Sequence, residues 1–173
     1  MQQTQQDTDD GSKAALDVSQ YLTFQLAGET YAIDILNIRE IIEYGNITAV
    51  PMMPDFIAGV INLRGSVVPV IDLAVRFDGD KTDITKRTSI IIVEVSDDDL
   101  HLEVGVVVDV VNEVLDIAAS EIEPAPAFGS SIRTDFISGM GKVKDKLLIL
   151  LNVENVLSIE ELSIVSNLHE GTK

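Results

Sequence analysis

The 173-residue sequence contains no cysteine and no tryptophan, and only 5% of its residues are aromatic. Without cysteine there is no disulfide framework, thiolate nucleophile or cysteine-based metal site, which fits a reducing compartment. Apolar residues nevertheless make up 46% of the chain, so the core must be built from Val, Ile and Leu, a composition typical of strands. The length allows one compact domain, or two small lobes that share a core.

Basic residues are also scarce, since 12 Lys and Arg face 29 Asp and Glu, giving a formal net charge of −17. Nucleic acids and anionic membrane surfaces are bound by clustered cations, so neither is expected as a partner. No apolar run approaches the roughly 20 residues of a membrane-spanning helix, and we predict no direct membrane insertion. Residues 1–20 are polar and acidic and lack the pattern of a signal peptide. They predict a disordered tail on a cytoplasmic protein.

Motifs that carry chemistry are almost absent. The chain has two histidines, His101 and His169, too few for a histidine-based triad or a zinc site. The segment Gly139-Met140-Gly141-Lys142 lacks the spacing and the following Ser or Thr of a phosphate-binding loop. Asp97-Asp98-Asp99 lacks the alternating oxygen ligands of a calcium loop and predicts a solvated turn. The sequence therefore predicts no catalytic residues, no metal and no cofactor.

Short apolar runs, some of them alternating with polar residues, predict a strand-rich chain. The polar segment 77–86 predicts a loop between two halves, and residues 154–168 predict a closing amphipathic helix. The runs at 60–63 and 67–73 are separated by Arg64-Gly65-Ser66 and should pair as a hairpin. The expected strands cover residues 21–26, 31–35, 38–42, 60–63, 67–73, 89–95, 104–111 and 147–153.

An internal repeat accompanies this pattern. The motif Phe56-Ile57-x-Gly59-Val60-x-x-Leu63 returns 80 positions later as Phe136-Ile137-x-Gly139-Met140-x-x-Val143, and the run 67–73 matches 147–153. Upstream the offset is 73, where Ile38-x-Glu40 faces Val111-x-Glu113 and Pro51 faces Pro124. The halves look duplicated, which predicts two similar small barrels packed together.

The segment Phe56-Ile57-Ala58-Gly59-Val60-Ile61-Asn62-Leu63-Arg64-Gly65, followed by Val68-Pro69-Val70-Ile71-Asp72-Leu73, closely resembles the CheW family of chemotaxis coupling proteins. The likeness runs from about Tyr21 to Leu162. It implies an all-β fold of two five-stranded SH3-like barrels sharing a core, with short helices and a C-terminal helix. The expected organisation is a tail over 1–20, a CheW-like domain over 21–165 and a flexible tail over 166–173.

The resemblance also implies a function without catalysis. Such a protein is a cytoplasmic adaptor, recruited to membrane receptor arrays, that couples chemoreceptors (methyl-accepting chemotaxis proteins) to the histidine kinase CheA. It binds the cytoplasmic tip of the receptors and the regulatory domain of the kinase, and it couples their states through binding free energy. The rival interpretations are a domain of a larger kinase or receiver fusion, a small all-β enzyme that uses carboxylates, and a structural β-protein.

The resemblance places receptor binding at Ile38, Glu40 and Arg64. Arg64 lies at a predicted hairpin turn, where a long cation can bind a partner or instead stabilise the fold. Ile38 is alternatively a core residue, and Glu40 is alternatively a charge that protects an edge strand from aggregation.

Kinase binding is placed at Glu123, Pro124 and Phe128. An aromatic residue after two prolines suits an interface anchor, although Phe128 could equally cap its own barrel. The family often carries a basic residue where this chain has Glu123, so an ionic contact at that position would be altered or reversed.

Overall fold

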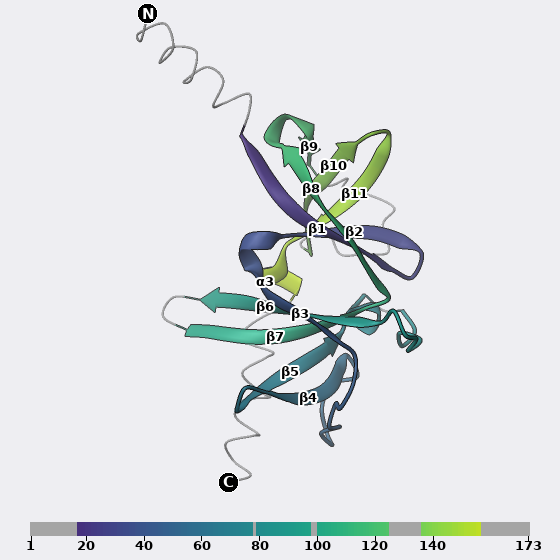
Figure 1. The fold of residues 1–173 in the computed structure, drawn as a ribbon, viewed down its shortest axis with the longest axis vertical. Coiled ribbons are helices and arrows are strands. Elements are labelled where there is room, and N and C mark those ends of the chain that lie inside the picture. Colours follow the sequence, from purple (N-terminus) through teal and green to yellow (C-terminus); the bar gives the residue numbers. More distant parts are fainter. Residues whose placement is uncertain (1–16, 78, 98–99, 125–135, 157–173) are drawn as a thin grey trace, which may run out of the picture.

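The computed structural model describes residues 17–77, 79–97, 100–124 and 136–156, and almost all regular structure in them is β (Figure 1). Two sheets contain the strands, and single turns of helix connect some of them. The strands are β1 (Val18–Leu26), β2 (Glu29–Asp34), β3 (Ile38–Glu43), β4 (Ile57–Leu63), β5 (Ser66–Asp72), β6 (Ser89–Asp97), β7 (Leu100–Val108), β8 (Val110–Ala118), β9 (Ile122–Glu123), β10 (Ile137–Val143) and β11 (Lys146–Leu151). The short helices are η1 (Ile35–Asn37), α2 (Leu73–Arg76), η2 (Ala119–Glu121) and α3 (Val153–Val156).

The five-stranded sheet, in the order β3-β6-β7-β5-β4, forms the first barrel. A bridge between Thr48 and Val60 joins the chain after β3 to β4 and so closes it. The six-stranded sheet, in the order β8-β1-β2-β11-β10-β9, forms the second barrel, in which the two-residue β9 follows β8 through η2 and pairs with β10. The predicted all-β fold of two SH3-like barrels is confirmed, with β9 as an additional short strand.

Each barrel contains strands from both halves of the sequence. The β1–β2 hairpin of the first half joins β8 to β11, while the β6–β7 hairpin of the second half joins β3 to β5. Figure 1 shows the purple β1–β2 hairpin beside the yellow-green β10–β11 hairpin. The halves therefore exchange their first hairpins, which the repeat alone does not indicate.

The duplication extends to the strand register. Val70 pairs with Gly105 in the parallel β5–β7 ladder, and Leu150 pairs with Ala32 in the parallel β11–β2 ladder. These two pairs are related by the sequence offsets of 80 and 73. The same register irregularity also precedes Gly59 in β4 and Gly139 in β10. The bridge of Thr48 with Val60 corresponds to the pair of Glu123 with Met140. Thr48 is therefore the structural equivalent of Glu123, and the predicted match of Pro51 with Pro124 is wrong by two positions.

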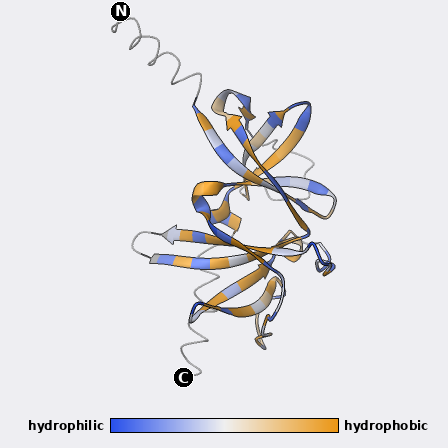
Figure 2. Cartoon of the chain, in the orientation of Figure 1, coloured by the Kyte–Doolittle hydropathy of each residue, from blue (hydrophilic) through white to orange (hydrophobic). Residues whose placement is uncertain are grey.

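Three apolar clusters form the interior of the part of the chain that the structure describes. Strand β6 is buried on both faces, as its continuous apolarity predicts: Ile90 and Ile92 pack inside the first barrel, whereas Ile91 and Val93 pack into a larger cluster between the barrels. Figure 2 shows polar and apolar residues alternating toward the outer end of the β6–β7 hairpin. The second barrel encloses the smallest cluster, Ala32, Ile117, Leu148 and Leu150. The cluster between the barrels is the shared core that the family resemblance implies.

An aromatic seam crosses this shared core. Phe24, Tyr31, Phe77 and Phe136 follow one another with ring centroids 5.6 to 5.9 Å apart. The Arg76 guanidinium lies 4.7 Å from the ring centroid of Phe56 and 5.1 Å from that of Phe136, and its Nε donates a hydrogen bond to the Val156 carbonyl at 2.9 Å. Phe56 and Phe136 are repeat-equivalent, so one cation joins matching residues of the two barrels.

Several boundaries differ from the sequence prediction. The expected strand 104–111 is divided between β7, which ends at Val108, and β8, which begins at Val110, and the expected strand 147–153 ends at Leu151. Strand β1 begins at Val18, within the segment expected as a tail, because Val18 and the residues after it pair with β8. The closing helix begins at Val153 and is seen as α3 to Val156. Its predicted continuation to residue 168, the tail over 166–173 and residues 1–16 lie outside the described residues.

Candidate functional site

The first barrel carries a charged pair at one end. Strands β4 and β5 are joined by Arg64 and Gly65, whose φ angles of 53° and 86° are those of a type I′ hairpin turn. The Asn62 Oδ1 accepts a hydrogen bond from the Gly65 amide at 3.0 Å and holds the turn. Arg64 Nη1 lies 2.6 Å from Oε1 of Glu40 on β3. Two residues 24 positions apart in the chain, both predicted for receptor binding, are thus brought together.

The two members of this pair differ in exposure. The Arg64 side chain is 75% exposed and that of Glu40 is 25% exposed. Ile38, the third predicted residue, is half-buried and packs against the shared core. The packing of Ile38 supports the alternative that it is a core residue, whereas Arg64 presents most of its surface to solvent.

Sequence reasoning missed exposed apolar side chains on η1, β3 and β5. Leu36 in η1 is 87% exposed, Ile41 in β3 is 44% exposed, and Val67 in β5 is 41% exposed. Ile41 and Val67 belong to runs that the sequence assigns to strands, and Leu36 lies between two such runs, so apolarity alone carried no signal of exposure. Strand β3 ends the sheet order of its barrel, so the strand that carries Ile41 has a neighbouring strand on one side only in the described chain.

The predicted kinase-binding residues belong to the second barrel. Glu123 lies in β9, and its Oε1 is 3.2 Å from Nζ of Lys142 in β10. Pro124 follows β9 and is exposed. Phe128 lies outside the described residues. The predicted receptor and kinase residues that are described therefore lie on different barrels, joined by the shared core.

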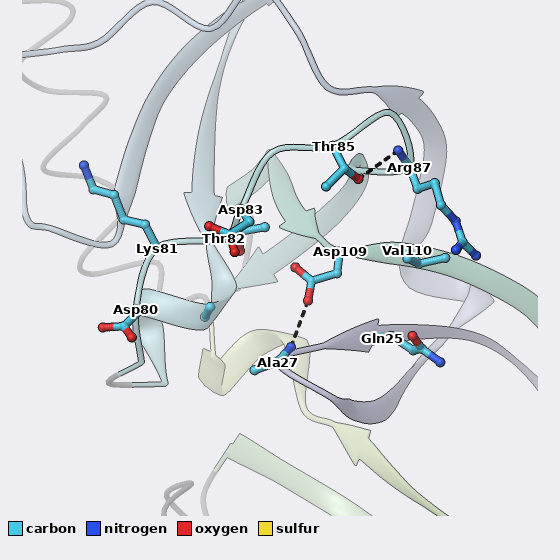
Figure 3. A pocket seen from close by; sticks show the side chains of 11 residues that line it. Gln25, Ala27, Asp80, Lys81, Thr82, Asp83, Thr85, Arg87, Asp109 and Val110 are labelled. Carbon is cyan, nitrogen blue, oxygen red and sulfur yellow. Dashed lines mark hydrogen bonds between the residues drawn. The ribbon is translucent and has the colours of Figure 1, made fainter.

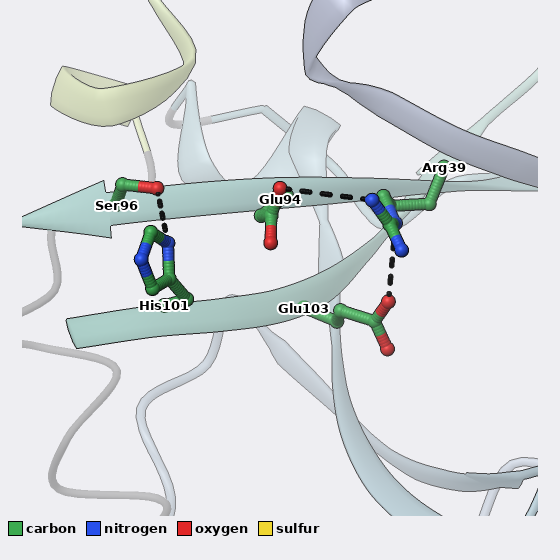
Figure 4. A network of polar contacts seen from close by, with 5 residues as sticks. All are labelled: Arg39, Glu94, Ser96, His101 and Glu103. Carbon is green, nitrogen blue, oxygen red and sulfur yellow. Dashed lines mark hydrogen bonds and ion pairs between the residues drawn. The ribbon is translucent and has the colours of Figure 1, made fainter. Parts of the chain in front are cut away.

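A second polar network joins side chains of β3, β6 and β7 in the first barrel (Figure 4). Arg39 of β3 reaches Glu94 of β6 at 3.9 Å and Glu103 of β7 at 3.5 Å. Farther along the same hairpin, His101 Nδ1 and Ser96 Oγ are 2.8 Å apart. His101 is exposed on β7. These groups are all partly exposed, so each ion pair contributes at most about 1 kcal/mol to stability.

A polar hollow of about 600 Å³ lies beside the loop that joins the halves (Figure 3). Asp109 is directed toward the β1–β2 turn, where its Oδ2 accepts a hydrogen bond from the Ala27 amide at 3.0 Å. The loop itself is fixed by the buried Asp72, whose carboxylate accepts hydrogen bonds from the Thr82 amide at 3.0 Å and hydroxyl at 2.9 Å. No group of three or more potential metal-ligating side chains occurs among the residues that the structure describes.

Two tyrosines have shifted acidities. Burial, and to a lesser degree the charge of Glu29, raises the pKa of Tyr31 to about 12. Burial and then the charge of Asp34 raise the pKa of Tyr21. Both shifts favour the neutral phenol, and Tyr31 belongs to the aromatic seam rather than to either predicted binding surface.

Comparison with known proteins places this geometry in a family. The model of the CheW-like domain matches residues 20–161. The chain is 40% identical over 148 residues to the chemotaxis protein CheW of Klebsiella aerogenes, covering 86% of this chain and 87% of that protein. It is 39% identical over 140 residues to the chemotaxis protein CheW of Bacillus subtilis, with coverages of 80% and 86%.

A solved structure agrees. The crystal structure of the scaffolding protein TtCheW from Thermoanaerobacter tengcongensis superposes with a TM-score of 0.74 at 38% identity, covering 83% of this chain and 90% of that one. The chain belongs to the CheW-like family. Within the described residues, no helix is long and apolar enough to cross a membrane.

Proposed function

We propose that this protein is a non-catalytic chemotaxis adaptor that couples chemoreceptors to the histidine kinase CheA. The observation that supports this most directly is the separation of two candidate partner surfaces onto two barrels with one shared core, in a chain of the CheW-like family. An adaptor of this kind works by holding both partners in one geometry, so that the state of one biases the state of the other.

The receptor surface is the region around Arg64, Glu40 and Ile38. Arg64 supplies an exposed cation in a rigid hairpin turn, Val67 supplies exposed apolar area in the same hairpin, and Ile41 is an exposed apolar residue that follows Glu40 in β3. A mixed apolar and charged surface suits the tip of a helical receptor, since apolar burial gives affinity and a charge gives orientation. Ile38 supports this surface by packing against the shared core.

The kinase surface is the region around Glu123 and Pro124 in the second barrel, together with Phe128, which the family resemblance adds and which lies outside the described residues. Glu123 is paired with Lys142, so its negative charge is balanced by the neighbouring strand. The protein is cytoplasmic and becomes concentrated beneath the membrane by its contacts with receptor arrays. Moderate individual affinities suffice there, because multivalency multiplies them.

A charge-swap experiment tests the receptor surface. Arg64→Glu should weaken binding to a receptor cytoplasmic fragment in a titration, and adding Glu40→Arg should rebuild the ion pair in reverse without restoring binding. Full recovery in the double variant would show that the pair only shapes the turn. Kinase binding serves as the internal control, since both substitutions lie in the first barrel.

A further inference from the structure

The tip of the β10–β11 hairpin concentrates positive charge. Lys142, Lys144 and Lys146 are three of the 12 basic residues of a chain whose net charge is −17. All three are exposed and lie within five consecutive positions, where the exposed Asp145 is the one acidic residue, so three positive charges face one negative charge. Local charge of one sign on a surface of the other sign favours a partner with the opposite local charge.

This hairpin is the repeat equivalent of the one that carries Arg64. Lys144 stands 80 positions after Arg64, and its φ of 51° matches the 53° of Arg64. Asp145 occupies the place of Gly65 at a φ of 65°. Both barrels therefore present a cation at the first position of a type I′ turn.

An exposed apolar residue accompanies the cations. Leu147 is 56% exposed and is the direct cross-strand partner of Lys142, so the two side chains share one face of the hairpin. Its equivalent in the first barrel, Val67, is also exposed. The surface thus places basic groups beside an exposed apolar residue, and protein interfaces combine an apolar core with a polar rim.

The charges are engaged differently in the two barrels. Arg64 is bound by Glu40, but the equivalent residues Lys144 and Glu113 form no ion pair. In the described part of the chain, neither Lys144 nor Lys146 forms a salt bridge, while Lys142 binds Glu123. Two cations at the tip are therefore available to a partner.

We propose that the hairpin surface formed by residues 142–147 docks an acidic, apolar-lined surface of the kinase regulatory domain. This inference rests on the proposed function. The 3.2 Å contact between Lys142 and Glu123 makes the hairpin continuous with the predicted kinase residues, which favours the kinase over the receptor. The net charge of −17 disfavours polyanions such as nucleic acid or an anionic membrane at this surface.

The test compares two double variants with the same change in charge. Lys144→Glu with Lys146→Glu should lower the association rate with the purified kinase regulatory domain on the order of tenfold at low salt, and by less at high salt. Lys81→Glu with Lys86→Glu, at exposed positions in the loop between the halves, should change the rate little. Leu147→Ser should raise the dissociation rate without affecting the fold, because the side chain is exposed.

Receptor binding by the same variants separates the outcomes. The hairpin variants should bind a receptor cytoplasmic fragment normally, whereas Arg64→Glu should lose the receptor and keep the kinase. The proposal is overturned if the hairpin pair affects kinase association no more than the loop pair, or if it impairs the receptor instead. A folded wild-type protein that binds neither partner would refute the proposed function itself.

Discussion

Replacing Arg64 by glycine should separate recognition from folding. The substitution removes the ion pair with Glu40, which is worth about 0.2–1 kcal/mol because Arg64 is largely exposed. Glycine adopts the left-handed φ of 53° without the steric cost that Arg64 has there, which stabilises the folded state by about 1 kcal/mol. Glycine also gives the unfolded chain more conformational freedom, which lowers stability by about 0.4–1 kcal/mol. The terms nearly cancel, so the free energy of unfolding should change by less than about 1 kcal/mol.

Urea unfolding followed by circular dichroism measures this change, and titration with a receptor cytoplasmic fragment measures recognition. We expect a midpoint shift below about 1 M urea together with a clear loss of receptor affinity. Lys144→Gly is the matched control, because it changes the equivalent turn residue, with a φ of 51°, in the second barrel. It should leave receptor affinity unchanged. A loss of stability above about 2 kcal/mol in Arg64→Gly, or unchanged receptor affinity, would refute the reasoning.

Three further predictions concern the framework that holds the two surfaces. Gly59→Ala should destabilise the protein by about 3 kcal/mol or more, because a Cβ there would lie 2.3 Å from the Thr48 carbonyl oxygen. Gly141→Ala is the control and should be tolerated in the same urea experiment, because the nearest atom to its added Cβ would be 3.4 Å away. Arg76→Ala should lower stability by about 2–3 kcal/mol. Arg76→Lys should recover only part of this loss, since an ammonium group cannot reproduce the contacts of the planar guanidinium. Equal stability of the two variants would contradict the bridging role of Arg76. Stability should fall as pH rises from about 10 to about 12, because folding raises the pKa of Tyr31 to about 12 and so favours its neutral form. Tyr31→Phe should reduce this pH dependence. An unchanged alkaline transition in that variant would mean that other groups cause the loss of stability.

The sequence predicted much of the framework because its signals are local. The continuous apolar runs placed β6 and β7, and Ile90 to Val93 are fully buried as expected. The repeat of Phe56 and Gly59 at Phe136 and Gly139 anticipated equivalent hairpins, which the structure shows with the same register irregularity. Local patterns of this kind predict structure well because they indicate which face of a strand must be buried.

Long-range features could not be predicted from the same signals. A repeat says which segments are alike but not which of them pair, so the exchange of hairpins between the barrels was not foreseen. Val18 belongs to β1 although the residues around it are polar, because β8 provides its partner strand. The contacts of Arg64 with Glu40 and of Lys142 with Glu123 likewise join segments distant in sequence, and only the fold brings them together.

The shared core gives the proposed adaptor its mechanical basis. Arg76 contacts Phe56 at the base of the first barrel's hairpin and Phe136 at the base of the second barrel's hairpin. The two hairpins begin from these matched residues, since Ile57 and Ile137 open β4 and β10. Partners bound to the two barrels would therefore be held at a fixed mutual orientation as long as this seam is intact.

Co-sedimentation of the purified protein with receptor-containing membranes and the kinase regulatory domain tests the central claim most directly. The account predicts that the regulatory domain sediments with the membranes in amounts that rise with added adaptor. The increase should be lost with Arg64→Glu. Sedimentation of the kinase domain that is independent of the adaptor, or a folded adaptor that binds neither partner, would contradict the account.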